Sequence, residues 1–233
     1  FNDMKIPVEN LFFYFNNGFK IALNALNAGR IKLAAANIDG QRRITGLAIN
    51  YANERKQFGV SISTFGAIRK KIAEMTTGIF VSEAAAYRAA KNVEDQIEEF
   101  VAAGSTHEEA ELKALEEYAV ECSILKVYVS DLTQHIADEG IQIYGGMGFS
   151  ADAPMEAAWR DARIGRIYEG TNEINRLLAV GMLIKKTMKG ELDLLKPAMA
   201  IGKELMGIPS FEIPDFSAYM SEEKALLHNL KKV

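Results

Sequence analysis

The sequence predicts an all-α fold, an antiparallel up-and-down bundle of four long helices. Its apolar residues recur at spacings of three and four over stretches much longer than a β-strand. Glycines follow three of these stretches, at Gly59, Gly104 and Gly145, where helices commonly end. Long helices with one apolar face and short connections bury that face most simply against each other, which favours a bundle.

The first two helices are expected over residues 18–53 and 65–102. Small residues at 34–36 would let the first helix pack closely, and Gly59 is expected to signal its end. The second helix would be about 55 Å long at 1.5 Å per residue, and Gly104 would end it. Its apolar stripe comprises Ile68, Ile72, Met75, Ile79, Ala86, Ala90, Val93, Ile97 and Phe100.

A third long helix is expected to run without a break from residue 107 to near Gly145. Ser105 and Thr106 would supply its N-cap, and the glutamates that follow would complete a capping box. Its apolar stripe comprises Leu112, Leu115, Ala119, Cys122, Leu125, Val129, Leu132 and Ile136.

The fourth helix is expected to begin near Thr171. One of its faces carries Ile174, Leu177, Gly181, Ile184 and Met188. Beyond residue 190, prolines at Pro197, Pro209 and Pro214 break the helical pattern. A different region is therefore expected to begin there.

Composition excludes several classes of protein. A formal net charge of −4 argues against a nucleic-acid-binding surface. The single cysteine, Cys122, lies in an apolar stretch and cannot form an internal disulfide, so we expect a core position and a reducing compartment. No apolar run approaches the roughly 18 residues of a membrane span, and no signal peptide is visible. Residues 1–8 read as the end of a β-strand, so we expect a fragment of a longer protein.

Residues 54–59, ERKQFG, allow two interpretations. They are typical of a charged helix end that is closed by a glycine cap. Alternatively, the planar guanidinium of Arg55 would hold two oxygens of a diphosphate, and Phe58 would supply an apolar wall.

Residues 142–149, QIYGGMGF, also allow two interpretations. Their glycines suit a simple turn between helices, because glycine adopts positive φ readily. They would equally let a flat or anionic cofactor approach the backbone. No strand precedes them, so the pattern does not indicate a dinucleotide-binding fold.

Residues 163–174, RIGRIYEGTNEI, place Glu169 just before the fourth helix. A carboxylate at a helix N-terminus gains about 0.3–1 kcal/mol from the helix dipole, so capping is one explanation. The neighbouring apolar or aromatic residues Trp159, Ile164, Ile167 and Tyr168 suggest another, because a poorly hydrated carboxylate suits a base that works near neutral pH.

Four motifs together resemble the C-terminal helical domain of acyl-CoA dehydrogenases, and the very-long-chain branch most of all. They are NAGR at 27–30, ERKQFG at 54–59, QIYGGMGF at 142–149 and WRDARIGRIYEGTNEI at 159–174. Their tandem order is far more specific than any single motif. The resemblance implies the end of a middle β-domain and a linker at 1–15, the helical bundle at 16–190 and the start of a C-terminal extension at 191–233.

The resemblance implies FAD-dependent α,β-dehydrogenation of fatty acyl-CoA to trans-2-enoyl-CoA in fatty acid β-oxidation. Glu169 would be the catalytic base that removes the α-proton, and FAD would accept the hydride. The implied FAD-binding residues are Arg55, Gln57, Phe58, Gln142, Gly145, Gly146, Thr171 and Glu173, of which the first three would reach the FAD of a neighbouring subunit. The implied substrate-binding residues are Asn27, Arg30 and Gly170, and no metal site is expected.

The resemblance also implies an electron-transfer flavoprotein as electron acceptor and a homodimer or homotetramer, with a dimer and peripheral membrane contact favoured by the very-long-chain branch. The expected location is the bacterial cytoplasm or the mitochondrial matrix. We expect the full-length protein to be active and this chain alone to be inactive. The alternatives are an acyl-CoA oxidase or related flavoprotein, and a non-catalytic helical oligomerisation module.

Overall fold

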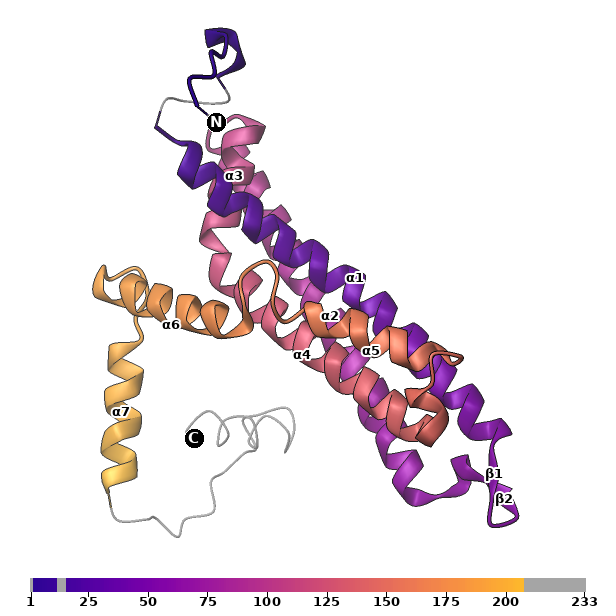
Figure 1. The fold of residues 1–233 in the computed structure, drawn as a ribbon. Coiled ribbons are helices and arrows are strands. Elements are labelled where there is room, and N and C mark those ends of the chain that lie inside the picture. The colour runs from indigo at the N-terminus through magenta and orange to yellow at the C-terminus, as the bar shows by residue number, and fades with distance from the viewer. Residues whose placement is uncertain (1, 12–15, 208–233) are drawn as a thin grey trace. The chain divides into compact units, whose positions relative to one another are not determined.

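A computed structural model describes residues 2–11 and 16–207 (Figure 1). Its α-helices are α1 (Gly18–Glu54), α2 (Gly66–Ala102), α3 (His107–Glu117), α4 (Ala119–Tyr144), α5 (Pro154–Ile164), α6 (Asn172–Met188) and α7 (Leu195–Met206). Short 3-10 helices lie at Val8–Asn10, Ile62–Thr64 and Gly145–Phe149, and two short strands form β1 (Lys56–Gln57) and β2 (Val60–Ser61). The predicted all-α class is confirmed.

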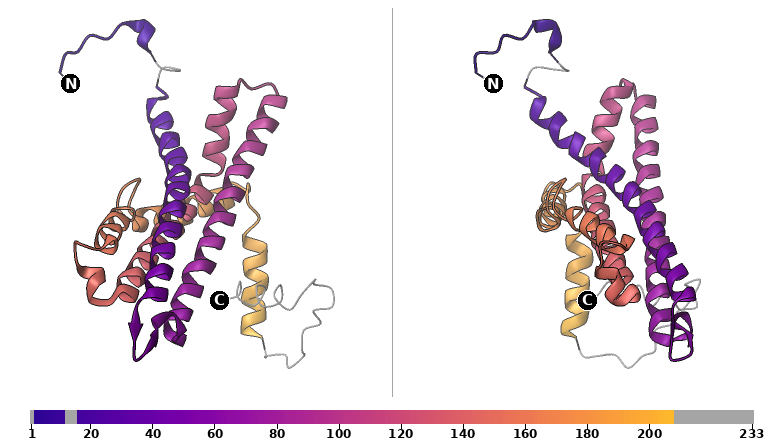
Figure 2. Two further views of the ribbon diagram at one scale, coloured as in Figure 1. Left: turned by 90° about the vertical axis from the view of Figure 1, so that its right-hand side faces the viewer. Right: turned by 45° about the vertical axis from the view of Figure 1, so that its right-hand side comes forward.

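The chain divides into two compact units, Phe1–Met182 and Leu183–Val233. In the first unit α1 packs along α4, and α2 returns antiparallel to both (Figure 2). Gln41 of α1 donates a hydrogen bond to the Val129 carbonyl of α4, and further along both helices Tyr51 stacks on Tyr144 with ring centroids 4.0 Å apart. α1 and α4 therefore run in the same direction.

Small side chains allow the close packing of α1. Ala34, Ala48 and Ala52 are fully buried. Of the predicted alanine-rich stretch at 34–36 only Ala34 is buried, and Ala35 and Ala36 are exposed. The largest core cluster comprises Ile44, Ala48, Ala52, Ile62, Met75, Ile79, Ile136, Ala137, Ile143, Met155 and Ala162. Burial of each large aliphatic side chain stabilises the bundle by about 1.5–3 kcal/mol.

The third predicted helix is two helices, so this prediction was wrong in part. Tyr118, with φ −93° and ψ 20°, leaves the α-helical conformation and separates α3 from α4. Neither glycine nor proline marks the break in the sequence. The predicted N-cap is confirmed, because the Thr106 hydroxyl accepts the Glu109 N–H at 3.3 Å.

The ERKQFG stretch does not end in a glycine cap. α1 ends at Glu54, and β1 pairs antiparallel with β2. Phe58 and Gly59 form the turn between them with φ of 53° and 82°. Two successive left-handed residues match the twist of a tight hairpin, which explains the glycine here.

Three further differences concern the ends of the chain. The predicted apolar stripe of the fourth helix is exposed at Ile174 and Leu177, and polar Asn172 and Asn175 are buried instead. Residues 2–11 contain no strand. Pro197 lies in the first turn of α7, where its missing N–H is not needed. The other two prolines, Pro209 and Pro214, lie outside the described residues.

None of the described helices is both long and apolar enough to cross a membrane.

Candidate functional site

Glu169 lies in the loop between α5 and α6 with its backbone in a left-handed conformation. Its φ is 58°, and φ of the following Gly170 is 82°. A non-glycine residue in this region is strained and persists only where surrounding contacts fix it. The contacts around the loop are therefore the starting point for its chemistry.

The Glu169 carboxylate lies directly against Gly29 of α1. A Cβ atom at Gly29 would be 2.9 Å from Oε2 and 3.1 Å from Oε1 of Glu169. α1 thus leaves room for the carboxylate only because residue 29 has no side chain. Oε2 is buried and has no hydrogen-bond partner within the part of the chain that the structure describes. A buried polar oxygen without a partner costs free energy, so its presence calls for an explanation.

The N-terminus of α6 is capped by Thr171 instead of Glu169. The Thr171 hydroxyl accepts the Ile174 N–H at 3.3 Å. Glu173 lies exposed in the first turn, where its own backbone N–H and then the Thr171 hydroxyl lower the pKa of its carboxyl group. The capping explanation for Glu169 is therefore not needed.

Arg30 holds the loop from the side of α1. Its Nε donates to the Glu169 carbonyl at 3.3 Å, and its Nη1 donates to Asn27 Oδ1 at 2.9 Å and Ser123 Oγ at 3.1 Å. Asn27 in turn donates to the Leu115 carbonyl at 3.3 Å. Burial lowers the pKa of Arg30, and the electrostatic interactions with Cys122 and then Glu169 act in the opposite direction. Both predicted substrate residues on α1 are thus engaged in internal hydrogen bonds.

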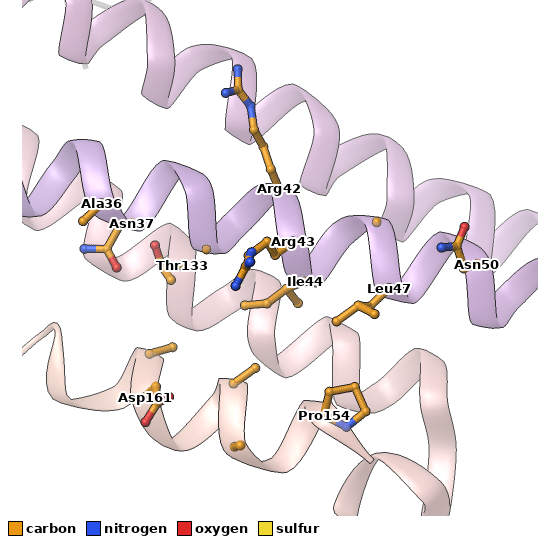
Figure 3. A pocket seen from close by; sticks show the side chains of 15 residues that line it. Ala36, Asn37, Arg42, Arg43, Ile44, Leu47, Asn50, Thr133, Pro154 and Asp161 are labelled. Carbon is orange, nitrogen blue, oxygen red and sulfur yellow. The ribbon is translucent and has the colours of Figure 1, made fainter.

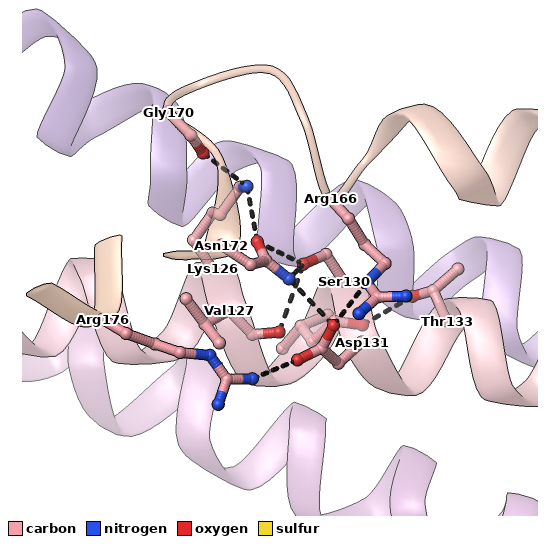
Figure 4. A network of polar contacts seen from close by, with 10 residues as sticks. Lys126, Val127, Ser130, Asp131, Thr133, Arg166, Gly170, Asn172 and Arg176 are labelled. Atoms are coloured by element: carbon pink, nitrogen blue, oxygen red, sulfur yellow. Dashed lines mark hydrogen bonds and ion pairs between the residues drawn. The ribbon is translucent and has the colours of Figure 1, made fainter. Parts of the chain in front are cut away.

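A polar network on α4 holds the end of the loop (Figure 4). Lys126 Nζ donates to the Gly170 carbonyl at 2.8 Å and to Asn172 Oδ1 at 2.7 Å. Asn172 Nδ2 donates to Asp131 Oδ1 at 2.9 Å. Burial, followed by the charge of Arg30, lowers the pKa of Lys126.

Asn175 of α6 completes the support of the loop. Its Nδ2 lies 3.3, 2.8 and 3.1 Å from the carbonyl oxygens of Glu169, Gly170 and Thr171, respectively. Three successive carbonyl groups therefore turn toward this side chain. The strained backbone of Glu169 is fixed from α1, α4 and α6 at once.

The predicted aromatic surroundings of Glu169 are only partly present. Tyr168 is adjacent, and burial followed by the charge of Glu169 raises its pKa. The Trp159 indole N–H instead donates to Asp138 on α4 at 3.3 Å. Ile164 and Ile167 are both exposed.

The other predicted cofactor residues form a second group. Arg55, Gln57 and Phe58 lie in or beside the hairpin after α1, and Phe58 is 92% exposed. Gln142, Gly145 and Gly146 lie at the end of α4 and are exposed. The Tyr51–Tyr144 stack joins these two helix ends. Along α1, residue 30 and residue 55 are about 37 Å apart at 1.5 Å per residue.

A cavity of about 740 Å³ lies between α1 and α5 (Figure 3). Asn37, Arg43, Leu47, Pro154 and Asp161 are among the residues that line it. None of the predicted site residues lines it. The cavity is therefore separate from the surroundings of Glu169.

In a comparison with known proteins, one family matches both the helical bundle and the loop that carries Glu169. The family profile described as acyl-CoA dehydrogenase, C-terminal domain, matches residues 16–182. The chain belongs to the acyl-CoA dehydrogenase family. The family that the four motifs suggested is thus confirmed.

Relatives within the acyl-CoA dehydrogenase family cover nearly the whole chain. A probable acyl-CoA dehydrogenase from Bacillus subtilis is 39% identical over 229 residues, which are 98% of this chain and 38% of that protein. The human mitochondrial very long-chain specific acyl-CoA dehydrogenase is 35% identical over 210 residues, 90% of this chain and 27% of that protein.

A solved structure also matches the acyl-CoA dehydrogenase domain described above. It is a Bacillus anthracis acyl-CoA dehydrogenase complexed with FAD, with a TM-score of 0.82 and 37% identity, covering 97% of this chain and 38% of that one. The chain thus spans less than two-fifths of the length of these relatives.

Sequence reasoning missed several residues that support the loop in this acyl-CoA dehydrogenase domain. Gly29, Lys126 and Asn175 contact it directly, and Asp131 anchors it through Asn172. One signal was available, because Lys126 interrupts the apolar run at 124–129. A buried lysine is rare and needs hydrogen-bond partners.

Proposed function

We propose that this chain is the helical domain of an FAD-dependent acyl-CoA dehydrogenase that converts fatty acyl-CoA to trans-2-enoyl-CoA in fatty acid β-oxidation. One observation carries the proposal: the Glu169 carboxylate has a buried oxygen without a hydrogen-bond partner among residues 2–11 and 16–207, and it rests against the bare backbone of Gly29. Such a carboxylate suits the removal of a proton from carbon next to a thioester.

In the proposed reaction Glu169 Oε2 accepts the α-proton of the acyl group. Arg30 and Asn175 hold the Glu169 carbonyl, so the base keeps its position while the proton moves. FAD, when bound, would supply the acceptor for the hydride that leaves the β-carbon. Gly170 follows the base directly and is the substrate contact that the loop offers.

The exposed groups at the other end of the bundle fit a flavin dinucleotide. Arg55 offers a planar fork for a diphosphate, and Gln57 and Gln142 offer amide donors. A Cβ atom at Gly145 or Gly146 would meet nothing within 4 Å, so their backbone is open to a flat ligand. These features support FAD as the cofactor.

The separation of the two groups supports an oligomer. Arg55 lies about 37 Å along α1 from Arg30, so we propose that the hairpin residues serve the FAD of a neighbouring subunit, whereas Thr171 and Glu173 serve their own. The highly exposed Phe58 ring fits burial in such an interface. This arrangement requires at least a homodimer, and a homotetramer would satisfy it too.

The remaining partner is the electron acceptor, which we propose is an electron-transfer flavoprotein. Reoxidation of the reduced full-length protein by that partner, and not by oxygen, is the expected result. Fast reoxidation by oxygen would instead identify an acyl-CoA oxidase.

The decisive experiment replaces Glu169 by Gln in the full-length protein. We expect exchange of the substrate α-proton with deuterated water, followed by NMR, to fall by about 10²- to 10⁴-fold while FAD stays bound. The matched control is Glu156→Gln on α5, whose carboxylate faces Arg160. Exchange at the unmodified rate in Glu169→Gln would refute the assignment of the base.

A further inference from the structure

We propose that Lys126 is a positioning residue for Glu169, an inference that rests on the proposed function. Lys126 lies on α4, and its side chain is fully buried. It touches neither the Glu169 carboxylate nor its peptide carbonyl by a hydrogen bond. It acts on the base through the next residue, Gly170.

The hydrogen bonds of the ammonium group end on the loop. They run to the Gly170 carbonyl at 2.8 Å and to Asn172 Oδ1 at 2.7 Å, which are both neutral oxygens. A buried ammonium is costly to desolvate, and hydrogen bonds to two oxygens compensate for this cost only while the loop stays in place. Lys126 therefore favours this one loop conformation over alternatives.

The other α4 contacts hold the flanks of the loop. Asp131 pairs with Arg166 at 2.7 Å and with Arg176 at 2.5 Å; Arg166 lies near the start of the loop and Arg176 lies after the loop on α6. Lys126 is the α4 residue that reaches the segment next to the base (Figure 4). Loss of its donor would leave the Gly170 carbonyl held from α6 by Asn175 alone, without support from α4, and would let the strained backbone of Glu169 relax.

Relaxation of this backbone would move the carboxylate away from Gly29. The gap there is tight, because a Cβ atom at Gly29 would lie 2.9 Å from Oε2. A misplacement of about 1 Å at a reacting group can cost about 10²-fold in rate. Lys126 therefore matters for the rate of proton removal more than for substrate affinity.

The test uses the full-length protein with Lys126→Met, which keeps the length of the side chain and removes the donor, and Lys126→Gln, which keeps an N–H donor without the charge. We expect kcat of Lys126→Met to fall by about 30- to 100-fold with KM changed less than about threefold, and Lys126→Gln to lie between it and the unmodified protein. Hydrogen exchange of the amides at 167–172 should be faster in Lys126→Met.

The matched control is Val129→Ala, one turn along α4 in the core. It should lower the melting temperature without changing kcat or hydrogen exchange of the loop. The proposal is overturned if Lys126→Met keeps its kcat, or if Val129→Ala loses as much kcat at an equal loss of melting temperature. If Lys126→Met does not fold, a folded Lys126→Gln with reduced kcat supports the proposal and one with full kcat overturns it.

Failure of the proposed function would look different. In that case the unmodified full-length protein would not exchange the α-proton of any acyl-CoA. Hydrogen exchange at 167–172 would still report whether Lys126 holds the loop.

Discussion

A single absent side chain defines the position of the proposed base, Glu169. Gly29 lies within α1, where glycine is otherwise unfavourable by about 1 kcal/mol relative to alanine. Its presence is explained by the Glu169 carboxylate, which occupies the space of the missing Cβ atom. Local helix stability and the proposed catalytic geometry therefore make opposite demands on this position.

Gly29→Ala should separate these two demands. The atoms that a new Cβ would meet belong to the end of a flexible side chain, so the carboxylate would move and the helix would stay. We expect the free energy of unfolding to rise by up to about 1 kcal/mol and α-proton exchange to fall by roughly tenfold or more. Urea denaturation and NMR-detected exchange in the full-length protein would measure both.

Gly46→Ala is the matched control on the same helix. A Cβ atom there would meet nothing within 4 Å. It should give a similar gain in stability with no change in exchange. Equal exchange rates in the two variants would argue against Glu169 as the base or against its place beside Gly29.

The residues of the candidate site could be predicted from the sequence to different degrees. The motif order led to Glu169 and Arg30, because these residues lie within the matched stretches. The role of Gly29 could not be predicted, since it depends on a carboxylate brought to α1 from a distant segment. Lys126 was detectable only as a charge within an apolar run.

At the scale of elements, hydrophobic periodicity located α1 and α2 within one or two residues of their observed ends. It failed at Tyr118, because a break without glycine or proline is set by packing and not by local preference. The glycines of the QIYGGMGF stretch also differ in their structural roles. Gly145 ends α4 with φ 62°, whereas Gly148 is buried in the 3-10 turn that follows.

Gly148→Ala should destabilise this turn. A Cβ atom there would lie 2.6 Å from the Ile141 carbonyl oxygen and 2.9 Å from its Cα, and this backbone cannot move without disturbing α4. We expect a loss of about 1–3 kcal/mol in the free energy of unfolding by urea. Gly146→Ala, whose Cβ would meet nothing within 4 Å, should change it by less than about 0.5 kcal/mol. Equal losses in both variants would contradict the packing shown for Gly148.

At the scale of the whole molecule, the tandem of motifs identified the family, because no single helix pattern is as specific. The predicted division of the chain at residues 15 and 190 stays a prediction.

The buried thiol of Cys122 links the stability of the whole bundle to pH, because unfolding of the bundle exposes this thiol to water. Burial, followed by the charge of Glu121, raises the pKa of Cys122 from 9.0 to about 11.

The raised pKa predicts a loss of stability at alkaline pH. The unfolded chain releases the thiol proton near pH 9, whereas the folded chain keeps it up to about pH 11. The contribution of the thiol to stability is therefore complete below pH 9 and is lost as the pH rises to about 11, by about 2–3 kcal/mol in total.

Comparison with Cys122→Ala isolates this effect from other titrating groups. The difference in the free energy of unfolding between the unmodified protein and the variant should shrink between pH 9 and 11. A constant difference over this range would mean that the thiol ionises equally in both states. Below pH 8 the difference should not depend on pH.

The contact of Glu169 with Gly29, and the support of the loop by Lys126 through Gly170, have a consequence for which substitutions can occur in this domain. The three residues come from α1, α4 and the loop before α6, yet each limits what the others can become. A side chain at position 29 would displace the carboxylate unless position 169 became smaller, and the loop can lose its left-handed turn only if position 126 no longer needs a partner. We therefore expect substitutions at positions 29, 126 and 169 to occur together. A chimaera that combines α1 of one relative with the loop of another would retain the helices but lose the position of the proposed base.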